Sequence, residues 1–306
     1  MPVYRGRFAP SPTGPLHFGS LVAALASYLE AKTHHGAWLL RIEDLDMQRN
    51  QTGAADCILK TLEELGFEWD ETVVFQSSRQ HLYASTLSEL QQRGLIYPCG
   101  CSRKEISDSA MQGVEGVIYP GTCRNGLPPN KYARAWRIRV ENRDISFEDA
   151  IQGHFTQNLT NEIGDFVLKR ADGFFAYQLA VVVDDAEQKI THVVRGSDLL
   201  ASTPRQIYLQ RALNLPELHY AHIPVALNHH GEKLSKQTHA APIDVNRSSE
   251  CLWQALAFLR QSPPDHLRHA SLTDIWHWAK ENWQLKHIIE TRPSIGQDSS
   301  AICPHP

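Results

Sequence analysis

The sequence predicts an α/β fold built around a parallel sheet. Two short apolar runs, residues 3–8 and 37–42, have the composition of buried strands, and a helical pattern over residues 20–32 lies between them. Two parallel strands need a crossover of this kind, and its right-handed form is nearly universal. In open sheets of this class ligands bind beyond the carboxyl ends of the strands, so the side chains at those ends are the first candidates for a site.

The first strand leads into a turn and the start of a helix. Residues 7–20 read RFAPSPTGPLHFGS, in which proline, serine and glycine form the turn. Free backbone N–H groups and the positive end of the helix dipole face such a turn, which makes it an anion site. His17 adds an imidazole, and Gly19 leaves bare backbone against which a nucleotide can lie.

A second polar segment, residues 231–237 (GEKLSKQ), places Lys233 and Lys236 around Ser235. Alone, the first motif is explained as a strand-ending turn and the second as a solvated loop. Together, in this order and more than 200 residues apart, they resemble the two signatures of class I aminoacyl-tRNA synthetases. The match is not complete, since Ser20 stands where the first signature has its second histidine.

Further helices and strands are predicted around this sheet. Helices are expected at 53–65, 80–93, 204–213, 249–261 and 271–284, and sheet segments at 181–183, 190–195 and 222–227. From residue 98 the pattern breaks into Cys, Gly and Ser, which indicates an inserted module. We divide the chain into a Rossmann-like catalytic domain at 1–97 and 166–240, an insertion module at 98–165 and a C-terminal helical region at 241–306.

Composition narrows the class of protein. Hydrophobic residues make up 42% and charged residues 21% of the chain, as in soluble globular proteins. The first eight residues lack the apolar core of a secretory signal, and the best apolar run, residues 21–29, is too short to span a bilayer. We therefore expect a cytoplasmic protein whose six cysteines are thiols or metal ligands.

The net charge of −4 argues against indiscriminate coating of nucleic acid, but one local surface is basic. Between Arg124 and Arg143 six basic residues face a single acid, Glu141. Within residues 133–141 apolar and basic side chains alternate, which predicts a strand with one basic face. Two interpretations stay open: a solvated edge protected against aggregation, or a surface that contacts phosphates.

Within class I, the glutamate-specific enzymes show the strongest resemblance, over most of residues 1–240. It rests on RFAPSPTG at the start, on residues 41–46 (RIEDLD) and on residues 195–200 (RGSDLL). The resemblance implies adenylate formation from ATP with Mg²⁺, with an ATP site formed by His17, Gly19, Lys233, Ser235 and Lys236. It also implies a glutamate site lined by Arg7, Ala9, Ser11, Glu43, Tyr177 and Arg195. The chemistry agrees, because a carboxylate can pair with an α-ammonium and guanidinium forks can hold carboxylates.

Only seventy residues follow Lys236, too few for the anticodon-binding domain of a full glutamyl-tRNA synthetase. This shortened form resembles the glutamyl-queuosine tRNA(Asp) synthetase family. The resemblance implies L-glutamate, ATP and tRNA(Asp) carrying queuosine as partners, with no membrane and no obligate protein partner. Two alternatives remain: a truncated synthetase that charges a tRNA 3′ end, and a binding module that has lost catalysis. The intact His17, Gly19 and two lysines speak against the second.

Three of the cysteines lie close together in the insertion. Cys99, Cys101 and Cys123 fall in a glycine-broken stretch, whereas the other three are isolated. Three thiolates fall short of the four ligands of a closed zinc site. The family resemblance supplies Tyr119 as the fourth ligand, and water or a nearby histidine is the alternative. One structural zinc ion is therefore expected in the insertion.

Overall fold

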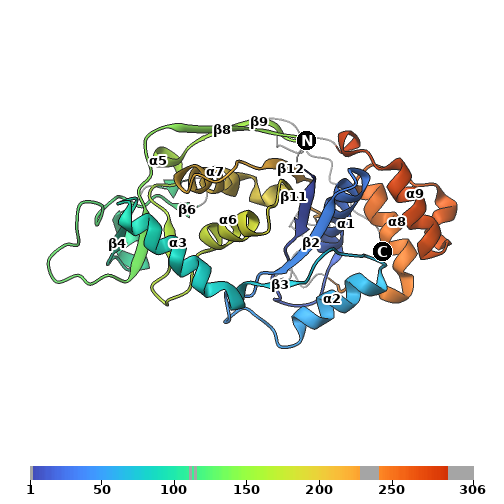
Figure 1. Ribbon diagram of the computed structural model, residues 1–306, viewed down its shortest axis with the longest axis horizontal. Helices are drawn as coiled ribbons and strands as arrows, with labels where there is room; N and C mark the ends of the chain where they lie inside the picture. The colour runs from blue at the N-terminus through green and yellow to red at the C-terminus, as the bar shows by residue number, and fades with distance from the viewer. Residues whose placement is uncertain (1–2, 110–111, 114–115, 228–240, 289–306) are drawn as a thin grey trace.

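A parallel sheet in two parts forms the centre of the computed structural model, which describes residues 3–109, 112–113, 116–227 and 241–288 (Figure 1). The first part has strand order β1–β2–β3, and the second contains the parallel pair β11–β12. The Thr191 N–H donates to the Arg5 carbonyl at 2.9 Å, which places β11 beside β1. The strands are β1 (Arg5–Phe8), β2 (Ala37–Ile42), β3 (Val74–Phe75), β11 (His192–Gly196) and β12 (His219–Ile223). The predicted α/β fold with a parallel sheet is confirmed.

Helix α1 (Phe18–Thr33) lies between this sheet and the C-terminal helices α8 (Ser248–Phe258) and α9 (Leu272–Asn282). Its long run of Leu and Ala is buried on nearly every side. An aromatic cluster locks the layers together, with ring centroids 5.0–5.6 Å apart. Pairs of this kind contribute roughly 0.5–1.5 kcal/mol each beyond the area they bury. The cluster consists of Tyr28, Trp38, Phe67 and Trp276.

A second core surrounds three helices, α3 (Gln80–Gln92), α6 (Tyr177–Glu187) and α7 (Thr203–Ala212). The prediction of sheet structure at residues 181–183 is wrong, because these valines lie inside α6. Every residue from 178 to 185 is buried, so the helix has no polar face over that stretch. A short apolar run of β-branched residues is then the same signal that a buried strand gives.

An antiparallel sheet in the order β10–β7–β4 lies around the predicted insertion, with β4 (Ile96–Cys99), β7 (Ala135–Ile138) and β10 (Val167–Lys169). Its outer strands cross the predicted bounds, since β4 begins before residue 98 and β10 follows residue 165. The predicted basic face of β7 does not point to solvent at Arg137, because the Tyr119 ring and Cys99 lie against that side chain. Arg137 is only 8% exposed, and Arg139 is half-buried with its guanidinium 4.9 Å from the Tyr97 ring. Arg134, before the strand, is exposed. The prediction of a solvated basic strand is therefore wrong at Arg137.

The hairpin of β8 (Asp144–Asp149) and β9 (Gly153–Asn158) was not predicted. Its strands pair residue for residue from Asp144–Asn158 to Asp149–Gly153. At Asp149, β8 also pairs in parallel with Tyr220 of β12. Part of the predicted insertion therefore extends the central sheet, and the long hairpin runs from the insertion toward β12 in Figure 1.

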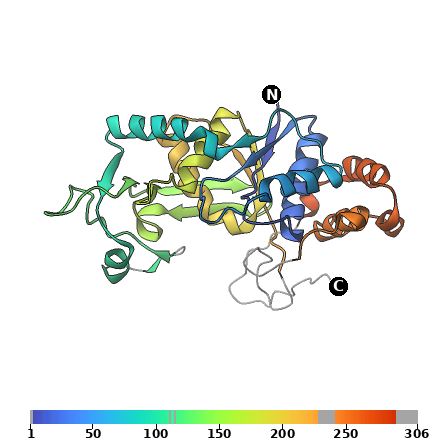
Figure 2. The same cartoon turned by 90° about the horizontal axis from the view of Figure 1, so that it is seen from below.

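The predicted helices are confirmed to within three residues at each end, whereas the strand predicted at 222–227 lies at His219–Ile223. The two ends of the molecule differ in content, with helices at one end and the insertion at the other (Figure 2). The remaining elements are α2 (Ala54–Glu64), α4 (Arg103–Ser109), α5 (Leu159–Glu162), β5 (Gln112–Gly113) and β6 (Gly116–Val117). Across the described ranges, we find no helix with the length and apolar character needed to cross a membrane.

Candidate active site at the carboxyl ends of the strands

The turn between β1 and α1 presents a helix start with an imidazole. Gly14, in the turn, has φ 141°, a conformation that favours glycine. His17 is the N-cap of α1, and its Nδ1 accepts from the Ser20 N–H at 3.4 Å. Its Nε2 lies 3.0 Å from the Ser20 hydroxyl. The serine that departs from the family signature therefore holds the imidazole, and Gly19 occupies the second position of the helix.

The chain returns to this turn after the second signature. Pro242 forms an antiparallel bridge with His17, and the Ile243 N–H donates to the Leu16 carbonyl at 3.0 Å. Residues 241–243 thus adjoin the start of α1, although the lysine segment itself lies outside the described residues. Three predicted ATP-binding residues belong to that segment: Lys233, Ser235 and Lys236.

Beneath the strand ends lies a network of buried charges. Arg7 is 3% exposed, and its Nε donates to Asp185 Oδ1 at 3.2 Å. Arg41, fully buried, places Nη1 2.8 Å from the same oxygen and Nη2 3.4 Å from Glu43 Oε1. Its Nε lies 3.9 Å from Asp184 Oδ2. The network therefore joins the ends of β1 and β2 to helix α6.

The charges of this network balance. Asp184 also accepts from Arg79 Nε at 2.6 Å, so three arginines face three carboxylates. Burial alone would raise the pKa of Asp185, but Arg7 and Arg41 hold it below the ordinary value. For Glu43 burial prevails and raises the pKa. The network therefore holds an ionised carboxylate, Asp185, close to a less acidic one, Glu43.

Near this network, Arg195 and Tyr177 face each other. Arg195 is 5% exposed, and its Nη1 lies 3.5 Å from the Tyr177 hydroxyl. Burial raises the pKa of Tyr177, and the charges of Arg195, Glu43, Arg7 and Asp185 all act on that hydroxyl. Tyr177 thus lies close enough to feel both the charge of Arg195 and the charges of the strand-end network. The structure brings the predicted glutamate-binding residues of β1, β2, α6 and β11 together.

The two remaining residues predicted for the glutamate site lie where the turn meets the second strand. The Glu43 N–H donates to the Pro10 carbonyl at 3.0 Å, which fixes the turn against the end of β2. Ala9 is half-buried beside this bond, and Ser11 is exposed. Both therefore lie in the turn that the Pro10 carbonyl ties to the end of β2.

The three cysteines of the insertion meet with Tyr119. The sulfurs of Cys99, Cys101 and Cys123 lie within 4.8 Å of one another. The Tyr119 hydroxyl is 3.4 Å from Cys99 Sγ and 3.7 Å from Cys101 Sγ, and it accepts from the Cys123 N–H at 2.9 Å. A Cβ on Gly100 would lie 2.8 Å from the Tyr132 carbonyl, so the turn between the first two cysteines needs glycine. The four predicted ligands are thus gathered at one point.

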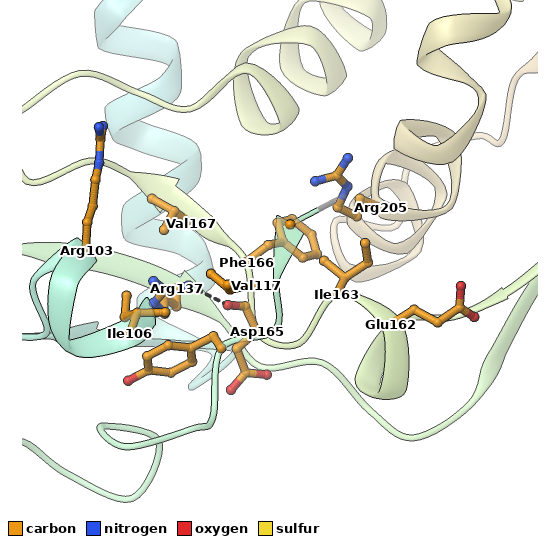
Figure 3. Close-up of a pocket in the computed structure, with 12 residues that line it drawn as sticks. Arg103, Ile106, Val117, Arg137, Glu162, Ile163, Asp165, Phe166, Val167 and Arg205 are labelled. Atoms are coloured by element: carbon orange, nitrogen blue, oxygen red, sulfur yellow. Dashed lines mark hydrogen bonds between the residues drawn. The ribbon is translucent and has the colours of Figure 1, made fainter. Parts of the chain in front are cut away.

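A buried arginine supports this cluster. Arg137 Nε donates to Cys99 Sγ at 3.4 Å, and its guanidinium lies 3.9 Å from the centre of the Tyr119 ring. Its Nη1 donates to the Asp165 carbonyl at 2.7 Å (Figure 3). Burial opposes ionisation of Cys99, but hydrogen bonds from Tyr119 and Arg137 hold the pKa of this thiol below its ordinary value. Arg137, Tyr119 and Asp165 border a cavity of about 350 Å³.

Comparison with known proteins places the chain in a family. Residues 4–257 match the family of tRNA synthetases class I (E and Q), catalytic domain. The glutamyl-Q tRNA(Asp) synthetase of Dechloromonas aromatica is 60% identical over 287 residues, which cover 93% of this chain and 95% of that protein. The enzyme of the same name from Aromatoleum aromaticum is 55% identical over 94% of this chain and 91% of its own. The chain belongs to the glutamyl-Q tRNA(Asp) synthetase family.

Solved structures agree with this membership. A glutamate tRNA ligase from Elizabethkingia meningosepticum, in complex with its amino acid, superposes with a TM-score of 0.78 at 27% identity, over 94% of this chain and 66% of that one. The glutamate-tRNA synthetase of Elizabethkingia anophelis gives 0.79 at 27% identity, over 94% of this chain and 67% of its own. This chain therefore spans about two thirds of the length of those ligases.

Several buried polar residues around the site were missed by sequence reasoning. Arg41 lies inside an apolar strand, and Asp184 and Asp185 end a run of valines. His222 and Asp149 are also buried, and they bond to each other although they lie 73 residues apart in the chain. An ionisable residue inside an apolar run was the available signal, because burial of a charge requires a partner.

Proposed function

We propose that this chain uses ATP to activate L-glutamate as glutamyl-adenylate and transfers the glutamate to the queuosine base of tRNA(Asp). Family membership supports the reaction class. The observation that carries the choice of amino acid is the environment of Arg195. Across the described residues its partners are neutral, namely the His222 ring, the Thr203 hydroxyl, the Leu199 carbonyl and the Tyr177 hydroxyl. A buried cation in such surroundings favours a ligand carboxylate over an amide.

In this proposal the two charge groups hold opposite ends of glutamate. Arg195 and Tyr177 bind the side-chain carboxylate, and Glu43 binds the α-ammonium. Because burial raises the pKa of Glu43, the arrival of an ammonium would favour its ionised form. Arg7, Ala9 and Ser11 border the intervening space, and Arg7 is already oriented by Asp185.

The start of α1 then receives the phosphates of ATP. His17, Gly19 and the helix dipole offer donors and positive potential at the turn. Lys233 and Lys236, with Ser235 between them, are proposed to neutralise the charge that grows on the α-phosphate as the glutamate carboxylate attacks it. Mg²⁺ bound to the phosphates would add to this neutralisation. Groups that meet charge only in the transition state contribute a factor of about 10²–10³ each.

The amino-acid assignment is tested by ATP–pyrophosphate exchange with glutamate and with glutamine. We expect exchange with glutamate, and its loss in Arg195→Leu to exceed any loss with glutamine. Equal weakening for both amino acids would assign Arg195 to structure or to ATP. Absence of exchange in the unmodified chain would favour the inactive binding module.

The acceptor is tested separately, with radiolabelled glutamate and three tRNAs. We expect labelling of tRNA(Asp) that carries queuosine, at the anticodon loop. Neither tRNA(Asp) without queuosine nor tRNA(Glu) should be labelled. Label at the 3′ end of tRNA(Glu) would instead support a truncated synthetase of the ordinary kind.

We further propose one structural zinc ion held by Cys99, Cys101, Cys123 and Tyr119. The donor set fits the metal, because three sulfurs and a phenol oxygen already lie together. The positive charge of Arg137 beside them stabilises thiolates, the form of cysteine that binds zinc. The ion would tie together a segment with few buried apolar residues. Metal analysis of protein purified without added zinc should give one ion per chain, and none in Cys123→Ser. Cys57→Ser, an exposed and isolated cysteine, should keep the full content.

We also propose the four-part organisation of the chain that the sequence predicts. A location in the cytoplasm, where the tRNA substrate is found, belongs to the same proposal. The insertion at 98–165 would present the metal-held segment, and the helices beyond residue 241 would support α1 from behind. Limited proteolysis tests the first of these, since cleavage should start within the insertion when zinc is removed.

A further inference from the structure

A buried histidine and aspartate stand behind Arg195. His222, on β12, is fully buried, and its Nε2 lies 3.0 Å from Arg195 Nε. Its Nδ1 lies 2.6 Å from Asp149 Oδ2, at the end of β8. Both side chains of this pair are shielded from solvent. Asp149, His222 and Arg195 therefore form a chain of hydrogen bonds that ends at the proposed glutamate pocket.

The proton positions in this chain follow from its two ends. Asp149 Oδ1 accepts the backbone N–H groups of Ile151, Gln152 and His222 at 2.8–3.1 Å, so the carboxylate is fixed and its Oδ2 faces the ring. A carboxylate accepts, which requires the proton of the imidazole on Nδ1. Nε2 is then an acceptor for Arg195. Burial lowers the pKa of His222 to about 4, which keeps the ring neutral near neutral pH.

This arrangement determines where the guanidinium points. His222 receives Arg195 Nε, and the Thr203 hydroxyl receives Nη2 at 2.8 Å. Nη1 remains directed at the Tyr177 hydroxyl, toward the pocket. Two of the three nitrogens are thus held by neutral acceptors behind the pocket. The third is left for a ligand.

We propose that Asp149 and His222 are positioning residues that aim the Arg195 guanidinium and thereby set selectivity for glutamate over glutamine. The inference rests on the proposed role of Arg195 in glutamate binding. It also links the β8–β9 hairpin to the pocket, because Asp149 lies at the point where β8 pairs with β12. A change at the turn end of that hairpin should therefore alter the choice of amino acid without a contact to the ligand.

The test is Asp149→Asn, assayed by ATP–pyrophosphate exchange. The asparagine oxygen can still accept the three backbone N–H groups, but its amide donates to His222 Nδ1. The ring proton then moves to Nε2, where it opposes the Arg195 N–H. We expect KM for glutamate to rise about 10- to 100-fold, in line with the cost of a misplaced binding group. KM for ATP should stay unchanged, and the preference for glutamate over glutamine should fall by a similar factor.

A second pair of variants decides the matter even where Asp149→Asn does not fold. His222→Gln keeps an acceptor in reach of Arg195 and should retain KM for glutamate to within about threefold, whereas His222→Leu should match Asp149→Asn. Glu148→Gln is the control, since it makes the same chemical change one residue away on an exposed side chain of β8.

The outcomes distinguish the positioning role of Asp149 and His222 from the proposed role of Arg195. Wild-type KM and selectivity in Asp149→Asn and His222→Leu would overturn the positioning role. So would a fall in kcat alone, or equal effects of His222→Gln and His222→Leu. If Arg195→Leu also leaves KM for glutamate unchanged, the proposed function of Arg195 has failed instead. A defect in Arg195→Leu without one in the positioning variants separates the two claims.

Discussion

The charge network under the strand ends and the cysteine cluster of the insertion are stabilised in opposite ways. The network joins residues far apart in the chain, such as Arg41 and Asp185, and it is packed between the two large cores. The cysteine cluster forms within residues 99–123, and two of its cysteines belong to a small core of only five buried residues. The first pairs its charges with protein groups alone. The second gathers thiols that bond only weakly to one another and that suit a metal.

The two regions differ in what fixes their side chains in place. A pocket for a charged substrate needs its arginines fixed before the ligand arrives, and buried carboxylates do that at a cost in desolvation. A loop-rich segment with little core needs a cross-link instead.

The largest expected effect is that of Arg41→Leu. The change leaves Asp185, Asp184 and Glu43 without their shared cation in a buried site. Breaking a buried pair on one side costs about 3–5 kcal/mol, so the free energy of unfolding in urea should fall by that amount. The double variant Arg41→Leu/Asp185→Leu should be less damaging than the sum of the single changes. A loss below about 1 kcal/mol, as for a solvent-exposed ion pair, would contradict a buried network that depends on Arg41.

The next largest effect is a pH dependence of stability that comes from His222, behind Arg195. Burial lowers the pKa of folded His222 to about 4, against an ordinary value of 6.5. As pH falls through 6.5 the unfolded chain takes up a proton there and the folded chain does not, so stability present above pH 6.5 is lost down to pH 4. The full shift corresponds to about 3 kcal/mol.

Urea unfolding of the wild type and of His222→Gln across this window measures the effect. The variant should show the shallower loss on acidification. Burial lowers the pKa of His192 as well, also to about 4. That group is present in both proteins, so the difference isolates His222. Parallel curves would contradict the assignment of a neutral buried imidazole.

Local patterns explain how much of this was readable in the sequence. The first two strands, helix α1 and the turn that carries His17 follow from short apolar periods and turn residues, and Arg7 and Glu43 follow from their places at strand ends. The cysteines could be read from their spacing. Such features depend on residues near one another in the chain, so the sequence shows them directly.

The parts that could not be predicted depend on distant partners. The β8–β9 hairpin has a partly polar pattern, and Asp149 is buried only because β12 and His222 meet it. Arg137 looked exposed because alternation alone does not show that Tyr119 and Cys99 cover it. Without knowledge of the partner, the sequence does not distinguish a buried charged residue from a solvated one.

Arg137→Leu asks whether the cysteine cluster depends on a charge as the strand-end network does. The guanidinium donates to Cys99 Sγ and stacks on Tyr119, so it would stabilise ligands in their ionised form. Loss of such an outer contact typically weakens metal binding about 10- to 100-fold. Competition with a chromophoric chelator measures the affinity. The control is Arg134→Leu, three residues earlier and exposed, which should leave it unchanged. Equal affinities in both variants would limit Arg137 to packing.

The smallest effect is expected where a charge pair belongs to neither region. Glu89 and Arg93 lie one helical turn apart at the end of α3, with 2.9 Å between Arg93 Nη1 and Glu89 Oε1 and side chains that are 36–54% exposed. Water screens such a pair, and an i,i+4 pair with the acid first contributes about 0.3–0.5 kcal/mol. A double-mutant cycle of Glu89→Ala and Arg93→Ala, followed by urea unfolding, should return a coupling of that size that shrinks with added salt. A coupling as large as the loss in Arg41→Leu would mean that burial is not what distinguishes the strand-end network.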